Sequence, residues 1–140
     1  MEYRRFGNDI AVRLDRGEEV LDRLKKVCLA EGVKVATVSA IGATDDFTVG
    51  VLDVKAHKYL SNNYNGNHEI VSLCGNVTTK DGEFYAHLHM SASDKDGKTV
   101  GGHLNRAVIS ATCEMFVRVI DAKIEREFNE EVGLNLFKFE

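Results

Sequence analysis

Histidines at alternate positions of one segment are the residues of this chain best suited to chemistry. In residues 83–93 (Glu-Phe-Tyr-Ala-His-Leu-His-Met-Ser-Ala-Ser), the even positions are apolar and the odd positions are polar. Because successive side chains of a strand point to opposite faces, this alternation predicts a half-buried strand. His87 and His89 then lie together on the face away from the main core. Neutral imidazoles are common ligands of divalent metals, so the pair is a candidate for metal binding.

A third histidine is predicted to join this pair. His103 directly follows Gly101 and Gly102, and the turn-forming stretch 94–97 (Asp-Lys-Asp-Gly) lies between it and the first two histidines. A hairpin in register at that turn brings His103 back beside the pair. Three imidazoles with an open fourth position form a common zinc arrangement, in which the pKa of bound water can fall to about 7. The two glycines would let the backbone approach closely there.

The alternative is that these histidines are ordinary surface residues. The apolar set on the opposite face of residues 83–93 argues against a role in the core, but a His-x-His pair in a strand is not by itself a metal site. His57 and His68 lack the pattern and are interpreted as surface or packing residues.

Two charged residues are candidates to assist such a site. Glu114 stands among small and apolar residues, where it could orient a ligand histidine or act as a general base with a raised pKa. It could equally face solvent or pair with Arg106 or Arg118. Arg106 follows His103 closely and could hold an anionic ligand, or simply cover the surface.

The elements that must position these residues are mostly strands. Residues 18–31 carry apolar side chains at helical spacing and predict a helix that Gly32 ends. Polar stretches at 42–46 and 62–66 are interpreted as reversals between strands, and Asp81-Gly82 is typical of a tight hairpin. The strands before and after this hairpin and after the 94–97 turn should form an antiparallel meander, while 124–131 remains ambiguous. The predicted strands are Val33–Ile41, Phe47–Val54, Glu69–Thr79, Glu83–Ser93, Lys98–Leu104, Val108–Ile120 and Leu134–Phe139.

Composition limits the classes of function. A chain of 140 residues predicts one domain spanning residues 1–140, and its net charge of −4 has the wrong sign for binding nucleic acid by bulk charge. The three cysteines lack a CxxC motif and stand in apolar runs, and the N-terminus does not resemble a signal peptide. We therefore expect buried free thiols in a cytoplasmic protein. No run of apolar residues is long enough to span a membrane.

Four segments of the chain form a recognisable set of motifs. They are 69–76 (Glu-Ile-Val-Ser-Leu-Cys-Gly-Asn), 87–91 (His-Leu-His-Met-Ser), 101–104 (Gly-Gly-His-Leu) and 112–114 (Thr-Cys-Glu). The order and spacing of these motifs resemble those of the PPC domain (plant and prokaryote conserved, DUF296), from Phe6 to about Leu136. The resemblance implies an α+β fold with a curved, mostly antiparallel sheet and packed helices, and it implies a homotrimer. The family's His-x-His and Gly-Gly-His patterns fall on His87, His89 and His103.

The resemblance is to the stand-alone prokaryotic type, and the hypothesis it favours is a small cytoplasmic homotrimeric metalloprotein. Zinc, or another divalent metal, would bind the three histidines, and the protein would bind or act on an unidentified small molecule. Whether it is an enzyme stays open.

The alternative is a DNA-associated regulatory protein in which the domain serves trimerisation and partner binding. Plant members carry a proline-containing AT-hook before the domain, whereas this chain has no proline, so DNA binding would be weak. Residues 66–71 also differ from the plant Gly-Arg-Phe-Glu-Ile-Leu segment. A purely structural trimerisation domain with vestigial histidines is a third possibility.

Overall fold

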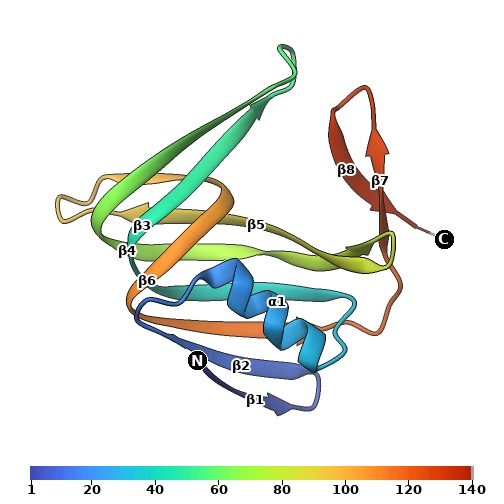
Figure 1. Ribbon diagram of the computed structural model, residues 1–140, viewed down its shortest axis with the longest axis horizontal. Helices are drawn as coiled ribbons and strands as arrows, with labels where there is room; N and C mark the ends of the chain where they lie inside the picture. Colours follow the sequence, from blue (N-terminus) through green and yellow to red (C-terminus); the bar gives the residue numbers. More distant parts are fainter. Residues whose placement is uncertain (140) are drawn as a thin grey trace.

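Long, bent antiparallel strands dominate the structure, a computed structural model that describes residues 1–139 (Figure 1). The elements are β1 (Glu2–Phe6), β2 (Asp9–Asp15), α1 (Val20–Ala30), β3 (Ala36–Asp53), β4 (Lys58–Lys80), β5 (Glu83–Ser93), β6 (Thr99–Val119), β7 (Glu125–Asn129) and β8 (Leu134–Lys138).

Six strands form one sheet in the order β1-β2-β6-β3-β4-β5, and β6 also pairs with β5. This extra pairing is made by the first residues of β6, while the rest of β6 lies between β2 and β3. The sheet therefore closes on itself where β5 meets β6. The closure pairs the start of β6 with the second half of β5, from His89 to Ser93, so it brings His103 next to the candidate histidines of β5.

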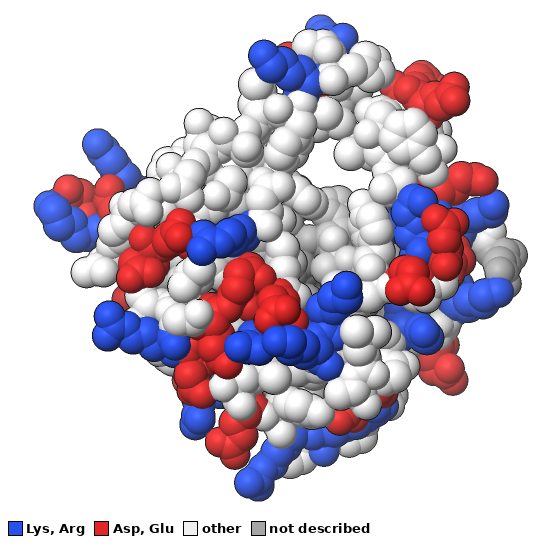
Figure 2. Space-filling view, viewed as in Figure 1, with Lys and Arg blue, Asp and Glu red and all other residues white. Residues whose placement is uncertain are grey.

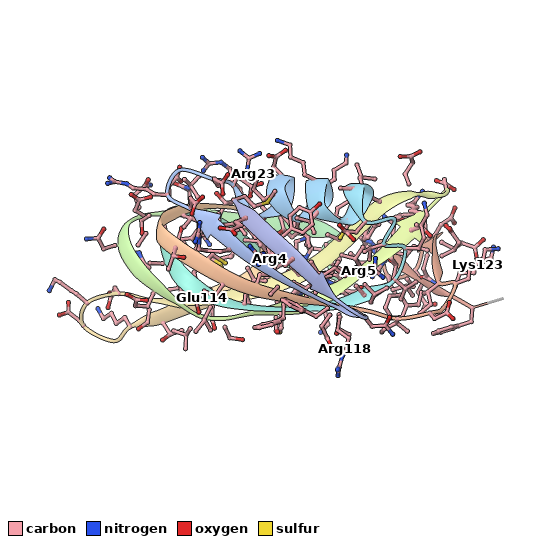
Figure 3. All side chains as sticks on the ribbon, turned by 90° about the horizontal axis from the view of Figure 1, so that it is seen from below. Arg4, Arg5, Arg23, Glu114, Arg118 and Lys123 are labelled. Carbon is pink, nitrogen blue, oxygen red and sulfur yellow. The ribbon has the colours of Figure 1, made fainter. Side chains whose placement is uncertain are left out.

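The core lies between the sheet and α1. The helix buries Val20, Leu24, Val27 and Cys28, which recur on one side of it as the sequence pattern predicts. Alternate residues of the central strands pack beneath it, so these strands bury one face and expose the other. Figure 3 shows α1 on one side of the curved sheet and the Arg118 side chain pointing away from it. The sheet thus has a helix-covered inner face and an outer face.

The expected α+β class with packed helices is wrong. Strands make up 69% of the residues and one short helix makes up 8%, so the fold is mostly antiparallel β. The expectation of several helices came from the family resemblance. Within the sequence, only 18–31 has apolar residues at helical spacing, and the structure follows that local signal.

The tight turns of the meander are confirmed. Asp81 and Gly82 both have positive φ, at 54° and 78°, as a two-residue hairpin turn requires. The Asp94–Gly97 turn then leads from β5 into β6, and the three strands β4, β5 and β6 pair in antiparallel order. The predicted C-terminal strand also exists, as β8, but it pairs with β7 in a separate two-stranded sheet.

Two predicted reversals are wrong, because both stretches run inside strands. Residues 42–46 belong to β3, where the pairing register shifts at Gly42 and Thr44, so the chain bulges and bends without turning back. Residues 62–66 belong to β4, where the Nδ2 of Asn63 donates to the Oδ1 of Asp46 at 3.0 Å across the strand pair. Polar residues that are typical of turns therefore lie inside strands here, where their side chains form hydrogen bonds between the two strands.

The cysteine prediction holds for two thiols out of three. Cys28 and Cys113 are buried, and burial raises their pKa values to about 12 and about 11. Cys74 is exposed, because it lies on the outer face of β4. Among residues 1–139, no helix is long and apolar enough to cross a membrane.

Candidate metal centre

The three histidines come together through the β5–β6 pairing. His87 and His89 lie on the outer face of β5, and His103 lies near the start of β6. The register places His89 directly opposite His103. Residues directly opposite in an antiparallel pair have Cβ atoms about 5 Å apart, so strand pairing alone brings these two side chains into contact. The prediction that the 94–97 turn returns His103 to this pair is confirmed.

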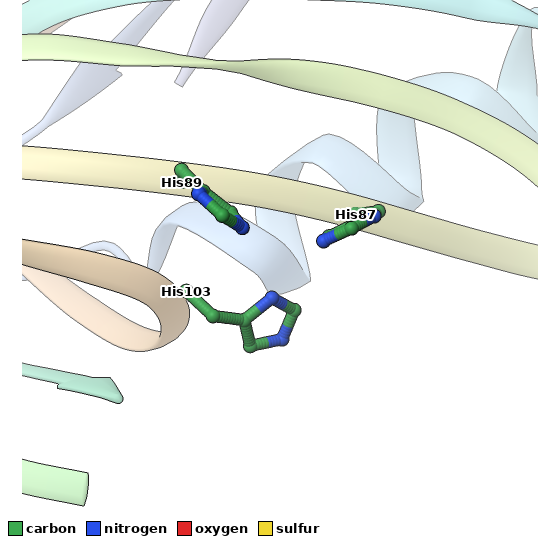
Figure 4. Close-up of side chains that lie close together, drawn as sticks. All are labelled: His87, His89 and His103. Atoms are coloured by element: carbon green, nitrogen blue, oxygen red, sulfur yellow. The ribbon is translucent and has the colours of Figure 1, made fainter. Parts of the chain in front are cut away.

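The rings converge on a common point. One ring nitrogen from each of the three histidines lies within 4.8 Å of the other two (Figure 4). The ring centroids are 5.1 Å apart for His87 and His103, 5.2 Å for His87 and His89, and 5.7 Å for His89 and His103. Nitrogens on a tetrahedral zinc ion lie about 3.3 Å apart, given bond lengths of about 2.05 Å. Small rotations of the side chains would close the group around an ion.

The electrostatics of the group favour neutral imidazoles. Burial is the main cause that lowers the pKa of His87 below its ordinary value of 6.5, and the charges of His103, Arg126 and His89 lower it further. Burial and, to a smaller extent, His89 lower the pKa of His103 in the same way. Both rings are therefore neutral at pH 7, which is the protonation state that binds a metal.

The glycines before His103 allow the close approach that the sequence predicts. A Cβ at Gly102 would lie 2.5 Å from the carbonyl oxygen of Gly50 on β3, and one at Gly101 would lie 2.7 Å from the carbonyl oxygen of Met90 on β5. Only glycine fits at such distances. The sharp bend that carries His103 from β5 to β3 therefore depends on these two residues.

Glu114 is not brought together with the histidines in this chain. It pairs with Ile41 far along β3, whereas His103 pairs with Gly50. Glu114 lines a separate surface hollow of about 390 Å³ with Arg13 and Phe116. Figure 3 shows it on the part of β6 that lies beside β2.

Arg106 is committed to an ion pair. Its Nη1 donates to the Oδ2 of Asp46 at 2.6 Å, and the same carboxylate accepts from the Nδ2 of Asn63 at 3.0 Å. This arrangement ties β6, β3 and β4 together. Arg106 therefore has a structural role at the surface, and its guanidinium is not free to hold an anionic ligand.

Asp46→Asn should weaken this contact modestly and in a pH-dependent way. Hydrogen bonds from Asn63 and then Arg106 hold the pKa of Asp46 below its ordinary value of 3.8. A carboxyl group with a lowered pKa in the fold stabilises it above the unfolded pKa, and this contribution is lost as the pH falls through the folded pKa. In urea unfolding we expect a loss of about 0.5 kcal/mol at pH 7, after allowance for solvent screening, and a difference from the wild type that shrinks as the pH falls below 3.8 through the lowered pKa of Asp46. An equal loss in the neighbouring control Asp45→Asn would refute this role for Asp46.

The other two histidines lie outside the group, as expected. His68 packs edge-on against Phe47, with its ring centroid 5.1 Å away, and its Nδ1 lies 2.7 Å from the carbonyl oxygen of Gly66. His57 lies at the tip of the β3–β4 hairpin with a positive φ of 47°. His68 is therefore a packing residue and His57 an exposed one.

The sequence does not predict two residues that lie next to His87 on the side of β4. Asn76 of β4 lies directly opposite His87, and the Nη2 of Arg126 donates to the Oδ1 of Asn76 at 2.7 Å. Arg126 belongs to β7, in the stretch that the sequence leaves ambiguous. Its neighbours along the chain give no signal, because its position depends on how the C-terminal hairpin packs on β4.

Comparison with solved structures shows close likeness along almost the whole chain. A protein from Bacteroides thetaiotaomicron, named a "putative dna binding protein", has a TM-score of 0.96 at 27% identity, covering 99% of this chain and 96% of its own. A metal-containing protein from Archaeoglobus fulgidus has a TM-score of 0.89 at 33% identity, with 99% and 97% covered. A plant- and prokaryote-conserved (PPC) protein from Pyrococcus horikoshii has a TM-score of 0.86 at 30% identity, with 99% and 94% covered.

Sequence comparison gives the family. No curated protein sequence matches the chain. The sequence profile of the Plants and Prokaryotes Conserved (PCC) domain, also written PPC, matches residues 1–121. Together with the 33% identity to the Archaeoglobus protein over nearly the full chain, this match confirms the resemblance seen in the motifs. The chain belongs to the Plants and Prokaryotes Conserved domain family.

Proposed function

We propose that residues 1–140 form a single domain of a cytoplasmic metalloprotein that binds a divalent ion, zinc in the first place, through His87, His89 and His103. The observation that carries the proposal is the convergence of three imidazole nitrogens, one from each histidine, within 4.8 Å of one another. Two further facts support it, namely the lowered pKa values of His87 and His103 and the likeness to a metal-containing protein of the same fold.

The donor set leaves room for a small molecule. Three nitrogen ligands occupy three of the four positions of tetrahedral zinc, and His89 is exposed, so a ligand can approach from solvent. Bound zinc would supply a Lewis acid for a carbonyl or carboxylate oxygen, or lower the pKa of a bound water. The protein's own contribution is to favour the neutral form of His87 and His103 and to fix all three imidazoles on two paired strands. Glu114 could act as a base only toward a ligand held in the separate hollow that it lines.

Elemental analysis of the purified chain tests this proposal. We expect close to one divalent ion per wild-type chain and little or none in His89→Ala, because that change removes one of the three ligands, the one directly opposite His103. Full retention of metal by His89→Ala would refute the ligand set. A wild-type chain that is free of metal, and whose thermal stability metal does not change, would favour a structural domain with vestigial histidines.

A homotrimer is the second part of the proposal. Neighbouring strands of the sheet carry large apolar side chains that are more than half exposed, among them Ile41, Val71 and Phe116. Exposed apolar surface of this extent is typical of a protein interface. Light scattering should give three times the mass of one chain.

DNA binding is the alternative, and the name of the Bacteroides protein favours it. Against it, the net charge is −4, and Figure 2 shows Lys and Arg interspersed with Asp and Glu on the face in view. Counterion release from phosphates requires clustered cations, so we expect only weak binding that salt abolishes. Sequence-specific retention of a DNA duplex at physiological salt would overturn this ranking.

A further inference from the structure

Arg126 is a charged residue buried beside the metal centre. It lies on β7, in the C-terminal hairpin that packs beside β4 and β5 (Figure 1), and its side chain is only 7% exposed. Its guanidinium lies between the rings of Tyr85 and Phe137, 4.6 Å from each centroid. One aromatic ring from β5 and one from β8 therefore contact this charge.

In the described part of the chain, the hydrogen-bond partners of Arg126 are neutral. Its Nε donates to the Oγ1 of Thr78 at 2.8 Å, its Nη1 to the carbonyl oxygen of Asn135 at 2.8 Å and its Nη2 to the Oδ1 of Asn76 at 2.7 Å. Among residues 1–139, no carboxylate lies within ion-pair distance of it, whereas the exposed Arg106 and Arg118 are each paired with an aspartate. A buried charge without a counter-charge is costly, and arginine does not lose its proton to avoid that cost.

This charge adjoins the histidines. Asn76, which accepts a hydrogen bond from Arg126, lies directly opposite His87 across the β4–β5 pair. Tyr85, on which the guanidinium packs, is on the same face of β5 as His87. A divalent ion held by three neutral imidazoles would add two positive charges next to the positive charge of Arg126. Such a site has a strong preference for a negatively charged occupant.

We propose that the small molecule bound at the open metal position is an oxyanion, a carboxylate or a phosphate, whose charge Arg126 balances. This inference rests on the proposed metal centre and adds the chemical class of its ligand. One oxygen of the anion would bind the metal, and the missing counter-charge of Arg126 would arrive with the ligand. The cation–π contacts with Tyr85 and Phe137 offset part of the cost of this charge, but neither ring supplies a negative charge.

The test compares anionic and neutral probes on the zinc-loaded full chain by calorimetric titration. Glycolate and glycolamide have the same shape and differ in charge, and inorganic phosphate shows whether carboxylates or phosphates bind better. Arg126→Gln keeps hydrogen-bond donors without the charge, Arg126→Lys keeps the charge, and Arg118→Gln is the control for an exposed, paired arginine on the outer face.

We expect the preference for glycolate over glycolamide to fall at least about tenfold in Arg126→Gln and much less in Arg126→Lys. It should be unchanged in Arg118→Gln, and the Tm of Arg126→Gln should stay close to that of the wild type. An unchanged preference in Arg126→Gln overturns the inference. If Arg126→Gln does not fold, Arg126→Lys decides, and equal binding of glycolate and glycolamide by Arg126→Lys also overturns the inference. A chain that never takes up zinc refutes the metal centre itself, and the metal content measured before titration separates that case.

Discussion

Zinc should stabilise the wild-type chain strongly against unfolding, and His103→Ala should remove most of that effect. A ligand that binds only the folded state contributes about 4 kcal/mol when its free concentration is about 1,000 times its Kd. For a chain of 140 residues, this corresponds to a rise in Tm of roughly 10–20 °C. The measurement is thermal unfolding followed by circular dichroism, with increasing zinc and then with a chelator.

The size of the loss follows from the position of His103. It is the only member of the three-histidine group on β6, so His103→Ala leaves two ligands that are both on β5. Losing a group that merely hydrogen-bonds a metal ligand already lowers metal affinity by about 10–100-fold. Losing a ligand should cost more, so the same zinc concentration would barely bind the variant.

A matched control separates metal binding from the general effect of removing a histidine. His57→Asn replaces an exposed hairpin residue whose positive φ asparagine tolerates, and it should keep the full response to zinc. Without zinc, His103→Ala should unfold close to the wild type, because its ring is only half-buried. A variant that still gains as many degrees from zinc as the wild type would show that the ion binds elsewhere.

The centre of the site could be predicted from the sequence because its signals are local. Strict alternation over residues 83–93 fixes which face of β5 carries His87 and His89, and a side-chain period of two leaves no freedom in that assignment. The short 94–97 turn then fixes the register of β6 against β5. Two local rules therefore sufficed to place three side chains within reach of one ion.

The long, bent strands could not be predicted in the same way. Residues 42–46 and 62–66 have the composition of turns, but their conformation is decided by neighbours that are distant in sequence. Thr44 is an example of such a distant neighbour contact. Its hydroxyl donates to the carbonyl oxygen of Val108 on β6 at 2.6 Å, at the point where the register between β3 and β6 shifts. A register shift in a sheet depends on three strands at once, and a single segment of sequence does not contain that information.

The position of Arg126 beside the site could not be predicted from the sequence. It lies beyond residues 1–121, the part of the chain that matches the family profile, and the charged stretch around it has no clear period. Its burial results from contacts of a separate two-stranded sheet with β4 and β5. A structure was needed to show that this arginine, rather than Arg106, lies beside the histidines.

Gly75→Ala should destabilise the fold by roughly 3 kcal/mol and weaken zinc binding at the same time. A Cβ at Gly75 would lie 2.1 Å from the carbonyl oxygen of His87 and 2.8 Å from the Cα of Leu88. Both atoms belong to the backbone of β5, so no side-chain rotation can relieve the contact and the strands must separate. Overpacking of a closed interior costs about 1–3 kcal/mol, and a clash with backbone lies at the upper end of that range.

The zinc affinity of Gly75→Ala should fall because the displaced carbonyl belongs to His87, a proposed ligand. Pushing β5 away from β4 at His87 moves that imidazole relative to His103, which is held by the pairing of β6 with β3. Urea unfolding without zinc and a zinc titration of the folded variant measure the two effects separately. Gly97→Ala is the control, because its Cβ would meet no atom within 4 Å and its positive φ should cost only about 1 kcal/mol. If Gly75→Ala were as stable as this control and bound zinc as tightly as the wild type, the β4–β5 pairing would not be what holds His87 in place.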